Sequence, residues 1–292
     1  MRHRTGEWQR FPHSIGVYDG ETAAGSAAFK TDGHRDPGMK VVVPVDPPRE
    51  GLVLSSLVDR TPLSDAEACG LYEAAVVDVL RAVASSGGEL LVNYRDSETL
   101  PDEYDGGDPE NEVRGLTAAA LGEFSEDTDG TDGEIRFERQ VGSSRTARVG
   151  NTVTHLLERE EAGSVGVLEP TVPLVGRTHI DGAAMSTRRH DVVLGPSSEG
   201  RTYLAAFGEP IDFGDAYAAP EVATLTERAR EAGLGVGFAP MRPTVATPAG
   251  LRSTVALLEA QRIAEKPGAE ATAAVVDELG LEVGADESLE RA

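Results

Sequence analysis

The chain of 292 residues is poor in cysteine, lysine, aromatic residues and long apolar runs. Its single cysteine, Cys69, excludes an intramolecular disulfide and a cysteine-based metal cluster. Only three of its 27 basic residues are lysines, and the acidic excess leaves no extended basic face, which argues against sequence-independent binding to nucleic acid. There is no apolar run of about 18 residues and no signal-peptide pattern, so we expect a cytoplasmic protein without a membrane span. The sequence does not indicate an oligomeric state.

Acidic residues dominate what is present. The 50 Asp and Glu residues outnumber the 27 Lys and Arg residues, which gives a formal net charge of −23. In molar salt the repulsion between such carboxylates is screened within about 3 Å. The acid excess, the use of Arg in place of Lys and the 5% aromatic content therefore predict a halophilic protein, and the alternative is an ordinary acidic soluble protein.

The two ends of the chain differ from its middle. Residues 1–38 hold the only tryptophan, Trp8, and show no sustained helical or strand period, so we expect a flexible extension or a start-site artefact. The alternative is a functional arm that contains histidines. We expect an α/β domain at 39–266 and an acidic C-terminal tail, with one helix, at 267–292.

Short runs rich in Val and Leu alternate with segments of helical period between these ends. Continuous β-branched runs such as Val41-Val42-Val43 are typical of parallel strands buried on both faces. Ser64 followed by Glu67 predicts a capping box at the start of the first long helix. We expect strands near 41–45, 89–93, 135–139, 164–169, 191–194, 203–207 and 235–239, and helices near 64–86, 113–121, 149–159, 178–189, 220–233, 251–265 and 271–279. Alternating strands and helices predict a three-layer α/β/α domain with a mainly parallel sheet.

One stretch carries a resemblance to a known family. The strand 191–194 leads into the polar turn Gly195-Pro196-Ser197-Ser198-Glu199-Gly200, and a second apolar segment follows at 203–207. This order resembles the middle of a family of nucleotide-diphospho-sugar transferase-like proteins with the GT-A fold, domain-of-unknown-function family 2064. That family is distantly similar to 2-phospho-L-lactate guanylyltransferase and molybdenum-cofactor guanylyltransferase. Taken as an order of elements, the resemblance spans about 39–265.

The resemblance implies a nucleotide or sugar nucleotide held between two loops at strand ends. It places the phosphates near the loop after the first strand and near the polar turn. The residues implied to bind the ligand are Pro44, Asp46, Arg49, Gly51, Ser55, Ser56, Gly195, Pro196, Ser197, Ser198 and Gly200.

Three features of the family's functional pattern are replaced, at four positions. Leu54 stands where the family has a phosphate-binding Lys, and Ser56 stands where it has an Arg. Thr171 stands where the family has a metal-binding Asp, and Ala246 stands where a late strand carries an acid. Mg²⁺ or Mn²⁺ generally requires one or two carboxylates. If a metal site exists, the resemblance therefore leaves Glu169 and Glu199 as its ligands.

Two functions from different classes follow. The first is a degenerate transferase-like protein that keeps the fold and weak nucleotide binding but lacks metal-dependent transfer. The second is an active nucleotidyl- or glycosyltransferase with a metal site rebuilt around Glu169 and Glu199. Nucleophilic hydrolysis has no support, because the chain has no Gly-x-Ser-x-Gly motif. We favour the degenerate transferase-like protein. Transfer from a nucleotide diphosphate depends mainly on cations near the leaving phosphates, and the residues that would supply or bind these cations are replaced.

Overall fold

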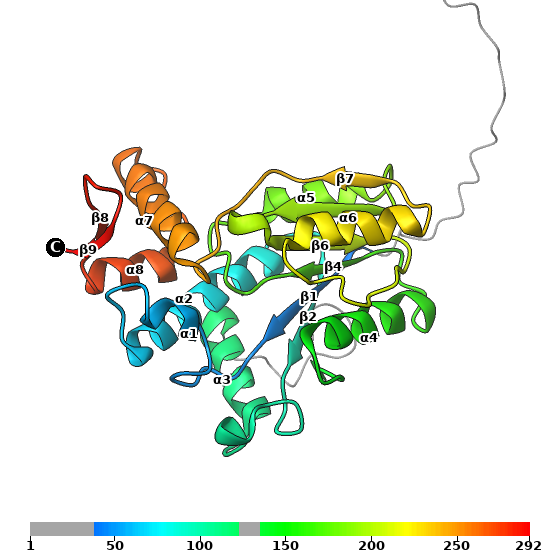
Figure 1. The fold of residues 1–292 in the computed structure, drawn as a ribbon, viewed down its shortest axis with the longest axis horizontal. Helices are drawn as coiled ribbons and strands as arrows, with labels where there is room; N and C mark the ends of the chain where they lie inside the picture. The colour runs from blue at the N-terminus through cyan, green and yellow to red at the C-terminus, as the bar shows by residue number, and fades with distance from the viewer. Residues whose placement is uncertain (1–37, 123–134) are drawn as a thin grey trace, which may run out of the picture. The chain divides into compact units, whose positions relative to one another are not determined.

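A seven-stranded sheet forms the centre of the protein (Figure 1). The computed structural model describes residues 38–122 and 135–292, so the predicted extension lies outside this range except for Gly38. The strand order is β3-β2-β1-β4-β6-β5-β7. The strands are β1 (Lys40–Val45), β2 (Glu89–Tyr94), β3 (Arg136–Arg139), β4 (Val165–Leu168), β5 (Val192–Pro196), β6 (Thr202–Phe207) and β7 (Val236–Phe238).

Most neighbouring strands in this sheet run parallel. β1 pairs in parallel with β2 and β4, β2 with β3, and β5 with β7. Only β6 runs against its neighbours, β4 and β5, because the polar turn returns the chain directly to the strand that it has just left. The predicted mainly parallel sheet is confirmed.

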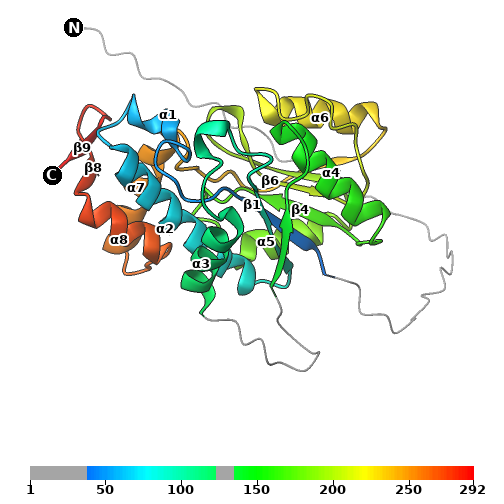
Figure 2. The ribbon, with the colours of Figure 1, turned by 90° about the horizontal axis from the view of Figure 1, so that it is seen from below.

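Helices cover both faces of the sheet. They are α1 (Ser55–Val58), α2 (Asp65–Ala84), α3 (Pro109–Leu121), α4 (Arg145–Glu158), α5 (Arg177–Ser186), α6 (Glu221–Glu231), α7 (Pro248–Ile263) and α8 (Glu270–Glu278), with the 3₁₀ turns η1 (Asp102–Tyr104) and η2 (Ser198–Gly200). In β1, Val41 and Val43 pack with α2, α3 and α5, whereas Val42 packs with α4. Figure 2 shows β1 and β4 between α2 and α3 on one side and α4 and α6 on the other. The predicted three-layer α/β/α architecture is confirmed.

Local signals explain where helices begin. The Ser64 hydroxyl accepts a hydrogen bond from Glu67 N at 3.3 Å, and the Glu67 carboxylate accepts one from Ser64 N at 2.8 Å, so the predicted capping box is present. Helix α4 begins four residues before the predicted 149, because Ser144 caps it by accepting from Ala147 N at 3.2 Å. This earlier start puts two arginines on the helix.

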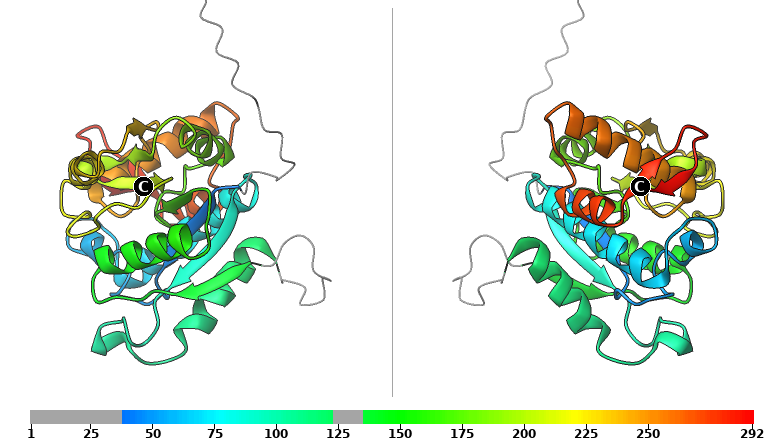
Figure 3. Two further views of the ribbon diagram at one scale, coloured as in Figure 1. Left: turned by 90° about the vertical axis from the view of Figure 1, so that its right-hand side faces the viewer. Right: turned by 90° about the vertical axis from the view of Figure 1, so that its left-hand side faces the viewer.

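The end of the chain packs against α2. The segment 267–292 contains α8 and a small hairpin, β8 (Leu281–Val283) with β9 (Leu289–Arg291). Buried Asp78 on α2 accepts hydrogen bonds from Ala271 N at 3.1 Å and from Thr272 N at 2.8 Å, which satisfies the start of α8. Helix α8, drawn in orange-red, lies beside α2 in the right-hand view of Figure 3.

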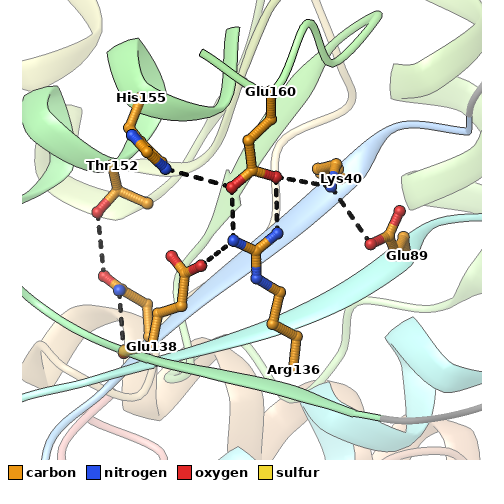
Figure 4. Close-up of polar contacts among 8 residues, drawn as sticks. Lys40, Glu89, Arg136, Glu138, Thr152, His155 and Glu160 are labelled. Carbon is orange, nitrogen blue, oxygen red and sulfur yellow. Dashed lines mark hydrogen bonds and ion pairs between the residues drawn. The ribbon is translucent and has the colours of Figure 1, made fainter.

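The amino ends of the strands carry a cluster of paired charges (Figure 4). Glu160, which follows α4, accepts hydrogen bonds from Arg136 at 2.7 and 2.5 Å and from Lys40 at 3.1 Å. His155 Nε2 lies 3.3 Å from the same carboxylate, and Arg136 also pairs with Glu138. This cluster, the amino-end cluster, ties β1, β3 and α4 together.

Among the described residues, no helix is both long enough and apolar enough to cross a bilayer.

Candidate functional site

A cavity of about 190 Å³ opens at the carboxyl ends of β1, β2 and β4. Asp46 directly follows β1, and Glu169 directly follows β4. In open α/β sheets this edge is where ligands usually bind, because loops present polar groups there. The lining residues are Pro44, Asp46, Leu52, Val53, Leu54, Tyr72, Asn93, Gln140, Arg145, Arg148, Val149, Glu169, Pro170 and Thr171. We call this space the strand-end cavity.

A much smaller cavity of about 20 Å³ adjoins it. Arg145, Glu169 and Thr171 line both spaces, and Ser197 and Ala246 line the smaller one. The fold therefore brings together three of the four positions at which the sequence departs from the resembled pattern: Leu54 and Thr171 face the strand-end cavity, while Thr171 and Ala246 face its neighbour.

Several of the residues that the resemblance implied lie elsewhere. The Arg49 guanidinium pairs with Glu112 at 2.7 and 2.9 Å, so it is committed to α3. Gly51 precedes α1, Ser55 begins it, and the Ser56 hydroxyl donates to Ala246 O at 3.3 Å. None of these four residues lines either of the two cavities.

The polar turn has a packing role beside its place at the site. A Cβ on Gly195 would lie 2.5 Å from the Tyr203 ring, so only glycine fits there. Pro196 ends β5, and Ser198 and Gly200 form η2 with Glu199. Glu199 is exposed, has a φ of 59° and lines neither cavity, whereas Ser197 lines the smaller one.

Arg145 is held from three sides. Its Nη2 donates to Glu169 at 2.7 Å and its Nη1 donates to Glu221 at 2.9 Å. The guanidinium lies 4.6 Å from the centre of the Tyr217 ring. Burial acts to lower the pKa of Arg145, but the two carboxylates outweigh burial and raise it. Arg145 is thus a fixed, fully compensated cation.

Arg148 lies one helical turn further and has no such compensation. Its Nε donates to the Gln140 amide oxygen at 2.7 Å, and no ion pair joins it to a carboxylate in the described part of the chain. Burial lowers the pKa of Arg148, and the nearby Arg95 and Arg145 lower it further, against a smaller opposing effect of Asp46. A recessed cation disfavoured by its surroundings is stabilised by an anion.

Asp46 and Glu169 are the two acidic residues that line the strand-end cavity. Burial raises the pKa of Asp46, although Arg95, whose Nη1 lies 3.6 Å from Oδ2, and Arg148 act to lower it. About a third of the Asp46 side chain remains exposed, 34%, so solvent and ligands can reach it. Burial likewise raises the pKa of Glu169, against the effect of Arg145.

The oxygens near Thr171 do not fit a divalent cation. The Thr171 and Thr244 hydroxyls hydrogen-bond to each other at 2.8 Å, and Ala246 N donates to Thr244 Oγ1 at 3.1 Å. Glu169 is already paired with Arg145. Within residues 38–122 and 135–292, no group of three or more His, Cys, Asp or Glu side chains could hold a metal ion. Mg²⁺ prefers carboxylates and water, and here the neutral oxygens already bond to one another.

Sequence reasoning missed the arginines of α4. The segment that contains them, Ser143-Ser144-Arg145-Thr146-Ala147-Arg148, was expected to precede a helix starting at 149. Ser144 as N-cap was the available signal: a helix starting at Arg145 places Arg145 and Arg148 three residues apart, on neighbouring positions of one face.

Comparison with solved structures identifies the architecture. A protein from Desulfovibrio desulfuricans G20 assigned as a nucleotide-diphospho-sugar transferase superposes with a TM-score of 0.61 at 20% identity, over 82% of this chain and 94% of its own. The chain has the nucleotide-diphospho-sugar transferase fold.

Two further solved structures are less similar to this chain. CMP:2-keto-3-deoxy-manno-octonic acid synthetase complexed with CTP has a TM-score of 0.43 at 13% identity, over 77% of this chain and 99% of its own. Molybdopterin-guanine dinucleotide biosynthesis protein A from Archaeoglobus fulgidus has a TM-score of 0.39 at 16% identity, over 78% and 100%. No protein-family model and no curated protein matches the sequence. The assignment of the fold rests on the first structure, and a fold by itself does not fix an activity.

Proposed function

We propose that this protein binds a nucleotide or sugar nucleotide in the strand-end cavity and lacks metal-dependent transfer. It would be a degenerate nucleotidyl- or glycosyltransferase-like protein, diverged from the domain-of-unknown-function family 2064 that its polar turn resembles. The cavity lies at the sheet edge where ligands bind in α/β proteins.

One observation carries the binding half of the proposal. Arg148 is a recessed guanidinium in the cavity wall, and within residues 38–122 and 135–292 its one hydrogen-bond acceptor is the amide oxygen of Gln140. Phosphoryl oxygens are the anions that a guanidinium binds best, because its planar N–H groups match their geometry. Arg148 would thus supply the cation that Leu54 does not.

The absence of transfer follows from the chemistry of the step. Breaking a nucleotide diphosphate develops charge on the leaving phosphates, and metal ions and cations stabilise that charge. Thr171 is neutral and already hydrogen-bonded to Thr244. Removal of such stabilisation costs on the order of 10³-fold in rate.

The second candidate is an active transferase with Mg²⁺ or Mn²⁺ on Glu169 and Glu199. The observation in its favour is that Glu169 lines both cavities. This candidate requires Glu169 to leave Arg145 and requires the exposed Glu199 to turn toward the cavity.

Calorimetric titration in molar KCl tests the proposal. The ligands are GTP, CTP and UDP- and GDP-sugars, each with and without Mn²⁺. We expect at least one to bind without metal and Arg148→Gln to weaken it by about ten- to a hundredfold, because charge-assisted hydrogen bonds are lost. The matched control is Arg262→Gln, since Arg262 is exposed and pairs with Glu259 far from the cavity.

Two outcomes would count against this function. Binding that appears only with Mn²⁺ and disappears in Glu169→Ala or Glu199→Ala would support the active transferase. Absence of binding by every ligand, in a protein whose far-ultraviolet spectrum is that of a folded chain, would remove the nucleotide from the proposal.

A further inference from the structure

We propose that arginine replaces the divalent cation at this site: Glu169 and Glu221 hold Arg145 as a fixed internal cation, and Arg148 binds the phosphoryl group directly. The inference rests on the proposed function, since it concerns the same cavity. It changes the role of Glu169 from a metal ligand to a residue that positions Arg145.

The first step is the immobility of Arg145. Glu221 is 7% exposed and uses both carboxylate oxygens, Oε1 to accept from Arg145 and Oε2 to accept from Thr202 N at 3.0 Å. Glu169 accepts from the other terminal nitrogen of Arg145, and the Tyr217 ring lies against its guanidinium. Rotating Arg145 toward a ligand would leave two recessed carboxylates without their cation, which is costly.

The second step is the charge that remains. Two carboxylates share the single guanidinium of Arg145, so this triad carries a net negative charge while both glutamates are ionised. Glu169 lines the strand-end cavity and therefore presents part of that charge to any ligand there. An anion in the cavity is repelled by Glu169 and attracted by Arg148.

The third step is the positioning of Arg148. Buried Gln140 donates from Nε2 to Asn93 O at 2.7 Å, which turns its amide oxygen toward Arg148 Nε at 2.7 Å. The amide is thus fixed by β2, and it fixes one side of the guanidinium. In the described part of the chain the two terminal nitrogens of Arg148 have no hydrogen-bond partner, so they can bind a planar pair of phosphoryl oxygens.

The two possible roles of Glu169, metal ligand or residue that positions Arg145, predict opposite effects of Glu169→Gln on ligand binding. If Glu169 were a metal ligand, the substitution would remove metal-dependent binding. If Glu169 only holds Arg145, glutamine keeps a hydrogen-bonding oxygen, Glu221 still compensates Arg145, and the repulsion of the ligand falls. Anion binding then becomes stronger.

Inorganic pyrophosphate, titrated calorimetrically in EDTA and then with Mg²⁺, is the probe. We expect binding in EDTA, little change with Mg²⁺, a loss of at least about tenfold in Arg148→Gln and a gain of a few-fold in Glu169→Gln. Arg148→Lys keeps the charge without the planar fork, so it should bind between the wild type and Arg148→Gln. Glu259→Gln is the matched control and should leave the affinity unchanged, because Glu259 is exposed on α7, pairs with Arg262 and lines neither cavity.

A requirement for Mg²⁺, a loss of binding in Glu169→Gln, or no pyrophosphate binding at all would overturn the inference. Melting curves of each variant establish that it is folded, and Arg148→Lys tests the charge if Arg148→Gln does not fold. The two proposals fail separately: pyrophosphate binding in EDTA without any nucleotide binding removes the nucleotide and keeps the arginine site. Metal-dependent nucleotide binding removes the arginine site and keeps the nucleotide.

Discussion

Both ends of the sheet strands carry basic and acidic side chains, but the two ends differ in how completely these charges are paired. In the amino-end cluster, Glu160 accepts from Arg136 and Lys40, and each cation also has a second acid, Glu138 or Glu89. At the carboxyl ends, Arg145 pairs with two carboxylates, whereas among the described residues the Arg148 guanidinium bonds to an amide alone. In the first arrangement each cation has two acidic partners, and this difference in charge balance is the basis of the binding proposal for the second.

The pKa directions follow this difference. Hydrogen bonds from Arg136 lower the pKa of Glu160 to about 2, because they favour the ionised carboxylate. Burial raises the pKa of Asp46 despite the arginines around it. A charged group that is favoured by its neighbours stabilises the fold, and one that is disfavoured marks a place where a ligand would relieve the cost.

Diluting the salt has the largest expected effect, because it acts on the net charge of −23 rather than on either cluster. The Debye length rises from about 3 Å at 1 M to about 10 Å at 0.1 M, so repulsion among surface carboxylates grows. We expect the far-ultraviolet circular dichroism to show unfolding at 0.1 M KCl and recovery when the salt is restored. A spectrum unchanged at 0.1 M would contradict the halophilic interpretation.

Glu160→Gln should be the most damaging single substitution at the amino ends. Its carboxylate is 22% exposed and receives charged hydrogen bonds from Arg136 and Lys40, so we expect the free energy of unfolding to fall by about 2 kcal/mol in denaturant titration. Glu169→Gln should cost clearly less, because Glu221 still compensates Arg145. Equal losses of unfolding free energy in Glu160→Gln and Glu169→Gln would contradict the difference in charge balance between the two ends of the strands.

The pH dependence of stability in acid tests the contribution of the same residue, Glu160. The folded-state pKa of Glu160, about 2, lies below the unfolded value of roughly 4.3, so its contribution is present above the unfolded pKa and is lost as the pH falls through the folded one. The gap in stability between the wild type and Glu160→Gln should therefore close toward pH 2. A gap that stays constant from pH 7 to pH 2 would assign the loss to packing instead.

Arg148→Met should stabilise the fold, in contrast to Glu160→Gln. The substitution removes a cation whose pKa is lowered by burial and by Arg95 and Arg145, and it keeps an unbranched side chain of similar length. We expect the free energy of unfolding to rise by about 1 kcal/mol while anion binding is lost, as in other sites that exchange stability for binding. A destabilised Arg148→Met would mean that Arg148 supports the fold.

The sequence predicted the sheet and its helices well, because the Val-rich runs and caps are local signals. Val41-Val42-Val43 and the Ser64–Glu67 box specify their elements without information from the rest of the chain. The predicted start of α4 was wrong by four residues. The apolar period begins at Val149, but Ser144 caps the helix and it begins at Arg145.

The candidate site was less predictable, because its charges are paired across distant segments. Glu169 meets Arg145 from α4 and competes for it with Glu221 from α6. Likewise, Arg49 is separated from the cavity by its pairing with Glu112. Such pairings depend on the packing of helices onto the sheet, which no spacing within a short stretch encodes.

The smallest expected effect is a pH dependence of anion binding at the carboxyl ends. Sulfate keeps its charge as the pH falls from 7 to 5. Burial raises the pKa of Asp46 and of Glu169, so proton uptake by these two carboxylates as the pH falls would remove negative charge from the cavity. The other titratable groups that line the cavity are Tyr72, Arg145 and Arg148. Burial raises the pKa of Tyr72 well above its usual value, so Tyr72 stays neutral, and arginine guanidinium groups remain protonated in this range.

We therefore expect sulfate to bind a few-fold more tightly at pH 5 than at pH 7 in calorimetric titration. Asp46→Asn should reduce this gain, and Asp46→Asn combined with Glu169→Gln should abolish it. Glu160→Gln is the matched control, because the carboxylate of Glu160, with its pKa of about 2, stays ionised throughout this range at the other end of the strands. If the double variant kept the full gain, the responsible proton would lie outside the strand-end cavity, and the difference in charge balance between the two ends of the sheet would not govern binding.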